Sequence, residues 1–416
     1  MQTIIKITKK IFTLIINFLV FISTLIVKKN KNIWLFGSWF GENFSDNSKY
    51  LYLYCINNKE KLGLDDVIWI TNNSDVYKEL KENNFKVFKK WSIKGIYFHL
   101  KAGYHFICQD TRDINSYFSV RSKRIQLWHG VGFKNIAMID QVPEINTLKY
   151  KLVYSLKLLA SPGMWYKHIF FSTSEFATKN IFNLSFRLFE NKVIEGNYPR
   201  NIYLKEINNN GTKYLNKQQR EYIDFINHEK SKGNTIILYL PTYRNLAQLV
   251  SKNEVLPLNI STTAEFINFD QFLGKNNLHF LSKFHFAGDK SIRDNRNNFS
   301  DLPIDLDIYP LLKHIDILIT DYSSVYADFL FLDKPIIFYP YDLQTYKNYD
   351  KGFLFEYSDV TPGEIVLNIE ELKSKILYVM KNDNYKEKRD KIRRMYFGEN
   401  EEDSFESIIR KIQSVD

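Results

Sequence analysis

The stretch from residue 315 to residue 340, IDILITDYSSVYADFLFLDKPIIFYP, decides the fold class. It begins with an apolar run at 315–320, continues through a polar turn into a helical pattern at 325–332, and ends with a second apolar run at 336–339. Short apolar runs of this kind are typical of buried strands. Because a helix connects the two runs, the stretch predicts a βαβ unit of a parallel sheet with helices on both faces.

The same alternation continues on both sides of this stretch. Further strand-like runs lie at 33–36, 67–71, 104–108, 125–128, 169–172, 235–240 and 279–283. A polar segment rich in Asn, Lys and Glu, 201–233, separates the two sets and predicts a linker with a surface helix. We therefore predict an α/β protein of two Rossmann-like domains, with a cleft between them at the carboxyl ends of the strands.

The expected organisation has five segments along the 416 residues. They are an N-terminal membrane-associated helix at 1–30, a first Rossmann-like domain at 31–205, a linker at 206–232, a second Rossmann-like domain at 233–395 and a C-terminal helix at 396–416.

The N-terminal segment carries 17 uncharged residues, 11–27, with lysines on both sides. As a helix this run spans about 26 Å, which is at the short limit for crossing a bilayer. A secretory signal would carry positive charge on one side and small residues at a cleavage site. The pattern instead favours a helix at the cytoplasmic leaflet, held by anionic head groups. A buried core helix and a single-pass anchor are the alternatives.

Composition narrows the class of protein. The chain has 57 Lys and Arg against 47 Asp and Glu, so its formal charge is +10. That excess favours anionic partners such as phosphorylated substrates, anionic lipid or nucleic acid, although solvated lysine faces would account for it equally well. The two cysteines, Cys55 and Cys108, form neither a disulfide framework nor a metal cluster and fit a reducing compartment.

Polar residues with chemical potential follow the strand-like runs in both halves. His129 and Lys134 follow the run at 125–128, and a histidine at a strand end suits proton transfer near neutral pH. Arg244 follows the run at 235–240, where a guanidinium suits phosphate binding. The alternatives are a structural histidine and an interdomain salt bridge.

Two more groups lie in the second half. Lys283 and His285 point to the same side of an extended strand, or form a solvated edge. Thr320, Ser323 and Ser324 offer hydroxyls where a helix begins, and either serine would be its N-cap. Backbone N–H groups at a helix start attract anions, although a plain capped helix fits as well. Together the four groups suit pyrophosphate binding and proton movement, which is what phosphoryl transfer needs.

Asp305-Leu306-Asp307 has a spacing that can hold Mg²⁺ through carboxylates. Both acids serve equally well as loop or cap residues, so we assign no metal site to them and no certain cofactor, and Mg²⁺ stays possible.

Several motifs follow one another between about residues 33 and 365. They are Asn47 with Lys49 and Tyr50, Trp128-His129-Gly130 with Lys134, Gly196 with Pro199-Arg200-Asn201, the block 319–324, Ala327-Asp328-Phe329, Asp333-Lys334-Pro335, the block 338–342, Gly352-Phe353 and Pro362-Gly363. In these motifs and their order, the chain resembles the CDP-glycerol glycerophosphotransferases of teichoic-acid and capsule synthesis.

The resemblance implies a GT-B fold, with the acceptor domain first and the nucleotide mainly on the second domain. It implies that His129 is the general base, that Arg244 and His285 neutralise the pyrophosphate of CDP-glycerol, and that a further set binds substrate. That set is Lys134, Thr320, Asp321, Ser323, Ser324 and Asp328. The acceptor hydroxyl would attack the β-phosphorus and CMP would leave.

The resemblance further implies peripheral attachment at the cytoplasmic side of the cell membrane, because the acceptor is a lipid-linked or growing polymer. CDP-glycerol and an anionic membrane surface are the expected partners, without nucleic acid; Mg²⁺ and a homo-oligomer stay open. Departures at Ile202, Asn245 and Lys351 leave ribitol phosphate as an alternative to glycerol phosphate. The expected fold also permits a GT-B glycosyltransferase that uses a nucleotide sugar, and a non-catalytic membrane scaffold is the third hypothesis.

Overall fold

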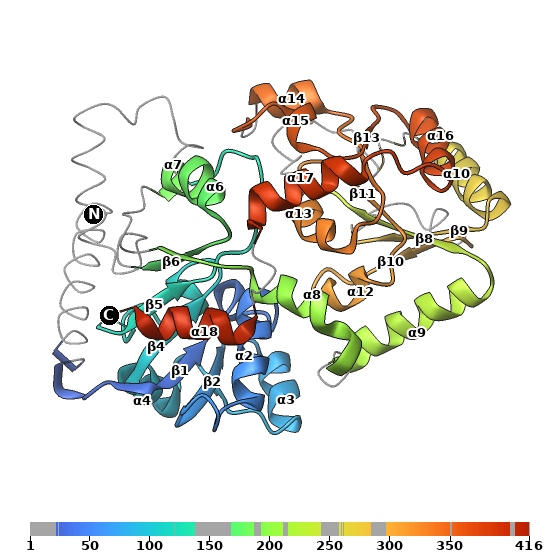
Figure 1. The fold of residues 1–416 in the computed structure, drawn as a ribbon. Coiled ribbons are helices and arrows are strands. Elements are labelled where there is room, and N and C mark those ends of the chain that lie inside the picture. The colour runs from blue at the N-terminus through green and yellow to red at the C-terminus, as the bar shows by residue number, and fades with distance from the viewer. Residues whose placement is uncertain are drawn as a thin grey trace, which may run out of the picture. The chain divides into compact units, whose positions relative to one another are not determined.

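The computed structural model describes residues 22–23, 25–119, 121–137, 168–186, 193–210, 215–242, 258, 260, 262–283, 297–349, 352–399 and 404–415. These residues form two compact units, each built on a parallel sheet flanked by helices (Figure 1). The first unit holds the described residues up to His129, those from 168 to 202, and those from 404 onward. The second holds 130–137 and 203–399.

The first unit contains seven parallel strands among its described residues, in the order β3-β2-β1-β4-β5-β6-β7. The strands are β1 Asn30–Phe36, β2 Asp66–Thr71, β3 Val87–Lys89, β4 Ala102–Ile107, β5 Lys123–Gln126, β6 Ile169–Ser172 and β7 Val193–Glu195. Its helical elements are η1 Trp39–Gly41, α2 Asp46–Asn57, α3 Ser74–Glu82, α4 Ile93–Lys101, η2 Thr111–Asp113, α6 Glu175–Ala177, the π-helical turn η5 Thr178–Phe182, α7 Asn183–Phe186, the start of α8 Pro199–Asn210, and α18 Phe405–Ser414.

The second unit contains six parallel strands within the described ranges, in the order β10-β9-β8-β11-β12-β13. The strands are β8 Thr235–Leu240, β9 Leu278–Ser282, β10 Phe299–Asp301, β11 Ile317–Thr320, β12 Ile336–Phe338 and β13 Glu364–Ile365. Its further helical elements are α9 Lys217–Ser231, α10 Thr263–Lys275, α12 Tyr309–Leu312, α13 Val325–Phe329, η9 Leu330–Leu332, α14 Leu343–Tyr349, α15 Tyr357–Val360, α16 Ile369–Val379 and α17 Lys386–Phe397.

The central strands are buried on both faces, which explains their nearly continuous apolar sequences. In the first unit Phe36 stacks on Phe106 with ring centroids 4.3 Å apart. In the second, Ile237, Ile319 and Ile337 lie in one core cluster with residues of α10 and α16. Polar side chains mark where the flanking helices begin: Asn216 with Gln219, and likewise Thr262 with Glu265, form capping boxes.

The prediction of an α/β protein with two parallel sheets is confirmed. The residues from 315 to 340 form β11, α13, η9 and β12 in the expected order, although the last helical turn is 3₁₀ rather than α. The prediction missed β3, β7, β10 and β13. All four lie at sheet edges and have only two or three residues, too few to produce a pattern.

The expected membrane-associated helix at 1–30 falls mostly outside the described residues, which begin at Ile22 and reach β1 at Asn30. In the part of the chain that the structure describes, no helix combines the length and apolar character needed to cross a bilayer. The expected linker at 206–232 contains α9, which contacts β8 of the second unit.

Helix α18, although last in the chain, packs on the first unit. Phe405 stacks on Tyr54 of α2 with ring centroids 4.6 Å apart. The Lys411 ammonium donates to the Glu195 carbonyl at 2.8 Å, and Glu406 accepts from Lys61 at 3.2 Å. The two ends of the described chain therefore contribute to one unit.

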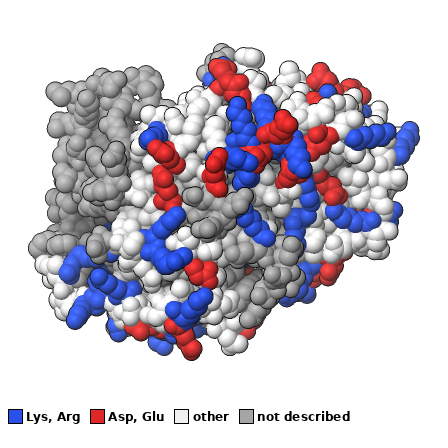
Figure 2. All heavy atoms as spheres, in the orientation of Figure 1, with Lys and Arg blue, Asp and Glu red and all other residues white. Residues whose placement is uncertain are grey.

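Charged side chains of both signs are interspersed on the face drawn in Figure 2. The positive excess of the sequence is therefore not gathered into one patch among the described residues on that face.

We expect the stability of the first unit to fall in mild acid, because of His99. Its Nδ1 lies 2.7 Å from the Gly95 carbonyl, and its Nε2 accepts the Asn115 backbone N–H at 2.9 Å, so the network needs a neutral ring. Burial lowers the pKa of His99 to about 3. The ordinary pKa is about 6.5, so this contribution is complete above pH ~6.5 and is lost as pH falls toward 3, at about 1.4 kcal/mol per pH unit.

Urea unfolding followed between pH 7.5 and pH 5 tests this expectation. Below pH ~6.5, His99→Gln should remove about 1.4 kcal/mol per pH unit from the slope, and His228→Gln, at an exposed position on α9, is the matched control variant. An unaltered slope in His99→Gln would contradict the assignment.

Candidate active site

His129 lies just beyond the carboxyl end of β5 in the first unit, where parallel sheets place their ligands. It is half-buried, and its Nδ1 lies 3.2 Å from the Cys108 carbonyl oxygen. A carbonyl only accepts, so Nδ1 is the nitrogen that carries the proton when the ring is neutral. The imidazole then holds its lone pair on Nε2, which is the form that a general base requires.

A buried polar frame holds the backbone of residues 128 and 129. Arg200 donates to the His129 carbonyl at 2.9 Å and to the Asp46 carboxylate at 2.7 Å. Asn47 donates to the Trp128 carbonyl at 2.9 Å and accepts the backbone N–H of Arg200 at 3.2 Å. The Asp46 and Arg200 side chains are 6% and 2% exposed, so water competes little for these bonds. Neither Asp46 nor Arg200 was among the predicted site residues.

A strained segment adjoins this frame. Trp39 and Phe40 have φ of 44° and 61°, a left-handed conformation that costs side-chain-bearing residues about 1–2 kcal/mol each. Asp113 accepts the backbone N–H groups of Phe40 and Cys108, both at 2.7 Å, and Lys90 donates to the Phe40 carbonyl at 3.1 Å. Burial raises the pKa of Asp113 to about 7 although its backbone donors oppose that rise.

In the second unit, Thr320 and Asp321 tie together the carboxyl ends of β8 and β11. The Thr320 hydroxyl donates to the Leu240 carbonyl at 2.6 Å. The Asp321 carboxylate accepts the backbone N–H of Thr242 at 2.7 Å and that of Tyr322. Both side chains are fully buried, so this geometry gives them a role in positioning the loop that follows β11.

Ser323 and Ser324 occupy that loop and are half-buried. Ser324 is the N-cap of α13, as expected, but its side chain makes no capping bond. Gly132 lies opposite: a Cβ at that position would stand 3.3 Å from the Ser324 Cβ, so a larger residue would press on the serine loop. The loop after Gly130 therefore approaches Ser324 closely within the second unit.

Backbone bonds fix that loop. Lys134 forms an antiparallel bridge with Phe353, and Leu354 donates to the Phe133 carbonyl at 2.7 Å. Asn135 donates to the Gly352 carbonyl at 3.2 Å. Two predicted motifs far apart in sequence, the one with Lys134 and Gly352-Phe353, thus meet in space.

Asp328 is fully buried on α13, where its carboxylate accepts the Tyr309 hydroxyl at 2.7 Å. Tyr309 follows the Asp305-Leu306-Asp307 sequence, and Asp307 accepts the Tyr309 backbone N–H at 3.3 Å in the turn before α12, whose N-cap is Ile308. No group of three His, Cys, Asp or Glu within the described ranges is arranged to hold a metal ion.

The third predicted group is only partly described. Lys283, at the end of β9, donates to the Leu306 carbonyl at 2.6 Å, and burial lowers the pKa of its ammonium. His285 and Arg244 lie outside the described residues. The second unit thus holds the predicted residues Lys134, Thr320, Asp321, Ser323, Ser324 and Asp328, while His129 belongs to the first unit.

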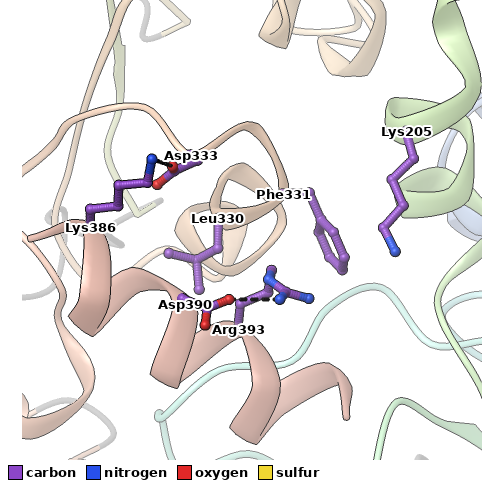
Figure 3. A pocket seen from close by; sticks show the side chains of 7 residues that line it. All are labelled: Lys205, Leu330, Phe331, Asp333, Lys386, Asp390 and Arg393. Atoms are coloured by element: carbon purple, nitrogen blue, oxygen red, sulfur yellow. Dashed lines mark hydrogen bonds and ion pairs between the residues drawn. The ribbon is translucent and has the colours of Figure 1, made fainter. Parts of the chain in front are cut away.

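The second unit also contains a cavity of about 250 Å³ (Figure 3). It is lined by Lys205, Leu330, Phe331, Asp333, Lys386, Asp390 and Arg393. Two of its cations are already paired, Lys386 with Asp333 at 3.4 Å and Arg393 with Asp390 at 2.7 Å. Because none of the predicted site residues lines it, we do not assign the reaction to this cavity.

Comparisons with known proteins agree on one family. The family model of CDP-Glycerol:Poly(glycerophosphate) glycerophosphotransferase matches residues 19–414. A teichoic acid poly(glycerol phosphate) polymerase of Bacillus spizizenii is 28% identical over 375 residues, covering 87% of this chain and 86% of its own. A teichoic acid glycerol-phosphate transferase of Staphylococcus aureus is 29% identical over 350 residues, covering 82% of each.

A structural neighbour supports the fold. The solved wall teichoic acid polymerase TagF superposes with a TM-score of 0.72 at 23% identity, covering 100% of this chain and 98% of that one. Since the family model spans nearly the whole chain, the protein belongs to the CDP-glycerol:poly(glycerophosphate) glycerophosphotransferase family.

Proposed function

We propose that this enzyme transfers glycerol phosphate from CDP-glycerol to a terminal hydroxyl of a lipid-linked or growing teichoic-acid or capsule polymer, releasing CMP. The family match over residues 19–414 carries the donor and the reaction type. The names of the two relatives support a teichoic-acid acceptor.

In the proposed reaction, Nε2 of His129 removes the proton of the acceptor hydroxyl. The resulting oxygen attacks the β-phosphorus of CDP-glycerol, a new O–P bond forms, and the bond from the β-phosphorus to the bridging oxygen breaks. CMP leaves with that electron pair, and His129 keeps the proton until it passes to solvent or product. The Nδ1 contact of His129 with Cys108 supports this role, because it fixes the tautomer.

The donor phosphates would be held by the second unit. The hydroxyls of Ser323 and Ser324 make no hydrogen bond to another described residue and lie at the carboxyl end of β11, so they suit donation to phosphate oxygens. Thr320 and Asp321 would act by holding their loop. Arg244 and His285 are proposed by resemblance to neutralise charge on the pyrophosphate, with Lys134 contributing a further cation.

We also propose that the enzyme works at the cytoplasmic face of the membrane. The uncharged run at 11–27, with lysines on both sides, supports attachment to an anionic surface. A lipid-linked acceptor requires the site to reach that surface.

CMP release by the purified protein tests the function, with CDP-glycerol and a lipid-linked glycerol phosphate acceptor. We expect release that depends on the acceptor. CDP-ribitol and a nucleotide sugar serve as parallel donors, and a sample with EDTA tests a need for Mg²⁺. Acceptor-dependent release from CDP-ribitol alone would change the transferred group, and release from neither CDP-polyol would refute the proposal.

A further inference from the structure

Two exposed aromatic side chains follow one another at positions 39 and 40, the first of them beside the proposed base, and neither has a part in the proposed proton transfer. Trp39 is 37% exposed and Phe40 is 39% exposed. The Trp39 ring lies next to the imidazole of His129, with centroids 6.1 Å apart and planes at 51°. A ligand resting on the indole would therefore be within reach of the histidine.

The segment that presents these rings is held in a conformation that its residues disfavour. Both have positive φ, which bulky side chains rarely adopt. The buried carboxylate of Asp113 and the ammonium of Lys90 fix the Phe40 N–H and carbonyl. A strained segment that is held by buried groups next to a reactive side chain is characteristic of a functional site.

The indole shares one support with the base. Its Nε1–H donates to Oδ2 of Asp46 at 3.2 Å, while Oδ1 of the same carboxylate accepts from Arg200 at 2.7 Å. Arg200 also holds the carbonyl of His129. Asp46 and Arg200 thus fix the orientation of both the Trp39 indole and the histidine. A surface that positions a substrate needs such a fixed orientation.

The chemistry of the exposed Trp39 and Phe40 rings determines which kind of ligand they can bind. The N–H of the indole is engaged with Asp46, so the exposed part of Trp39 offers its ring. The guanidinium of Arg112 lies 4.4 Å from the ring centroid of Phe40, but a carboxylate of Asp110 pairs with it at 2.6 Å. A neutral surface with C–H groups suits such rings better than a phosphate does.

We infer that Trp39, supported by Phe40, is the positioning and specificity residue for the acceptor. The C–H face of the terminal sugar or glycerol unit packs on the indole, and this contact aims the terminal hydroxyl at His129. The inference rests on the proposed function and adds to it the residue that binds the acceptor end.

Steady-state kinetics of CMP release by the full-length enzyme test this role. For Trp39→Ala we expect the KM for the acceptor to rise about tenfold, equivalent to ~1.4 kcal/mol, with the KM for CDP-glycerol within twofold of wild type. Trp39→Phe should recover part of the acceptor KM, because it restores an aromatic face but not the N–H that anchors the indole to Asp46. Trp91→Ala removes an exposed tryptophan elsewhere in the same unit, 60% exposed, and should leave both constants unchanged.

Two acceptors distinguish which terminal unit packs on Trp39. One acceptor ends in a sugar ring and the other ends in glycerol phosphate. A tenfold rise with either supports the inference and identifies the unit that packs on Trp39. An acceptor KM within twofold of wild type for both would overturn it, as would a Trp39→Phe variant no better than Trp39→Ala. If the wild-type enzyme itself released no CMP with any donor, the proposed function would be refuted instead. The two failures are therefore distinguishable.

Discussion

His129→Ala is expected to lower acceptor-dependent CMP release by about 10²–10⁴-fold, the usual contribution of a positioned general base. The loss should fall mainly on kcat, since the residue acts on the reacting hydroxyl in the chemical step and contributes little to the binding of either substrate. Stability should change little, because the frame of Arg200 and Asn47 holds backbone carbonyls that alanine retains. The measurement is CMP release at saturating CDP-glycerol and acceptor, with a melting temperature for each protein.

The matched control is His228→Ala, which removes an exposed histidine from α9. It should keep wild-type kinetics. If His129→Ala kept more than a tenth of wild-type kcat, a different group would have to be the base, and the tautomer argument from the Cys108 contact would lose its significance.

Arg200→Ala is expected to destabilise the first unit by about 3–5 kcal/mol, the usual result of leaving one member of a buried ion pair alone. Asp46 would stay buried without its 2.7 Å partner, and the His129 carbonyl would lose a donor. Activity should therefore fall together with stability, unlike in His129→Ala. Chemical unfolding and CMP release on the same samples measure both quantities.

A double variant separates the two effects. Asp46→Leu with Arg200→Met removes both charges, and stability should return in part because buried ion pairs can often be replaced by apolar residues. Recovery stays incomplete because position 46 has a left-handed backbone (φ 65°), which costs leucine about 1–2 kcal/mol. Activity should not return, since the donor to His129 and the anchor of Trp39 are both gone. The exposed pair Glu175 and Lys179 is the control, and its removal should leave the free energy of unfolding unchanged within measurement error. Restored activity in the double variant would contradict the positioning role.

Much of the fold could be predicted because its central strands are buried on both faces. A strand such as β8 or β11 must then be apolar at nearly every position, and that pattern is visible in sequence. The edge strands β3, β7, β10 and β13 are too short to carry such a signal. Their pairing is decided by the neighbouring strand, which single-sequence patterns do not contain.

The candidate site was predictable to the extent that it follows strand ends. His129, Ser323 and Ser324 were selected by that rule, and the structure places them beyond β5 and β11. Thr320 and Asp321 were selected by the same rule, but their side chains bond the backbone of the neighbouring strand end instead of facing outward. Position along a strand end does not reveal which way a hydroxyl or carboxylate turns.

The frame of the base could not be predicted from local pattern. Asp46 and Arg200 are 154 residues apart in sequence, and only the folded chain brings them together. Trp39 was hidden for a different reason, since its left-handed backbone is the opposite of what a tryptophan favours. Such residues are found where long-range bonds outweigh local preference.

The return of α18 to the first unit has a consequence for synthesis on the ribosome. The buried face of this helix, with Phe405, Ile408 and Ile412, covers a unit whose other residues are made before position 203. About 200 residues of the second unit must therefore be translated before the first can close, which at 5–20 residues per second takes roughly 10–40 s. During that interval Tyr54 and its neighbours stay uncovered, so nascent chains should engage chaperones there until the final helix emerges.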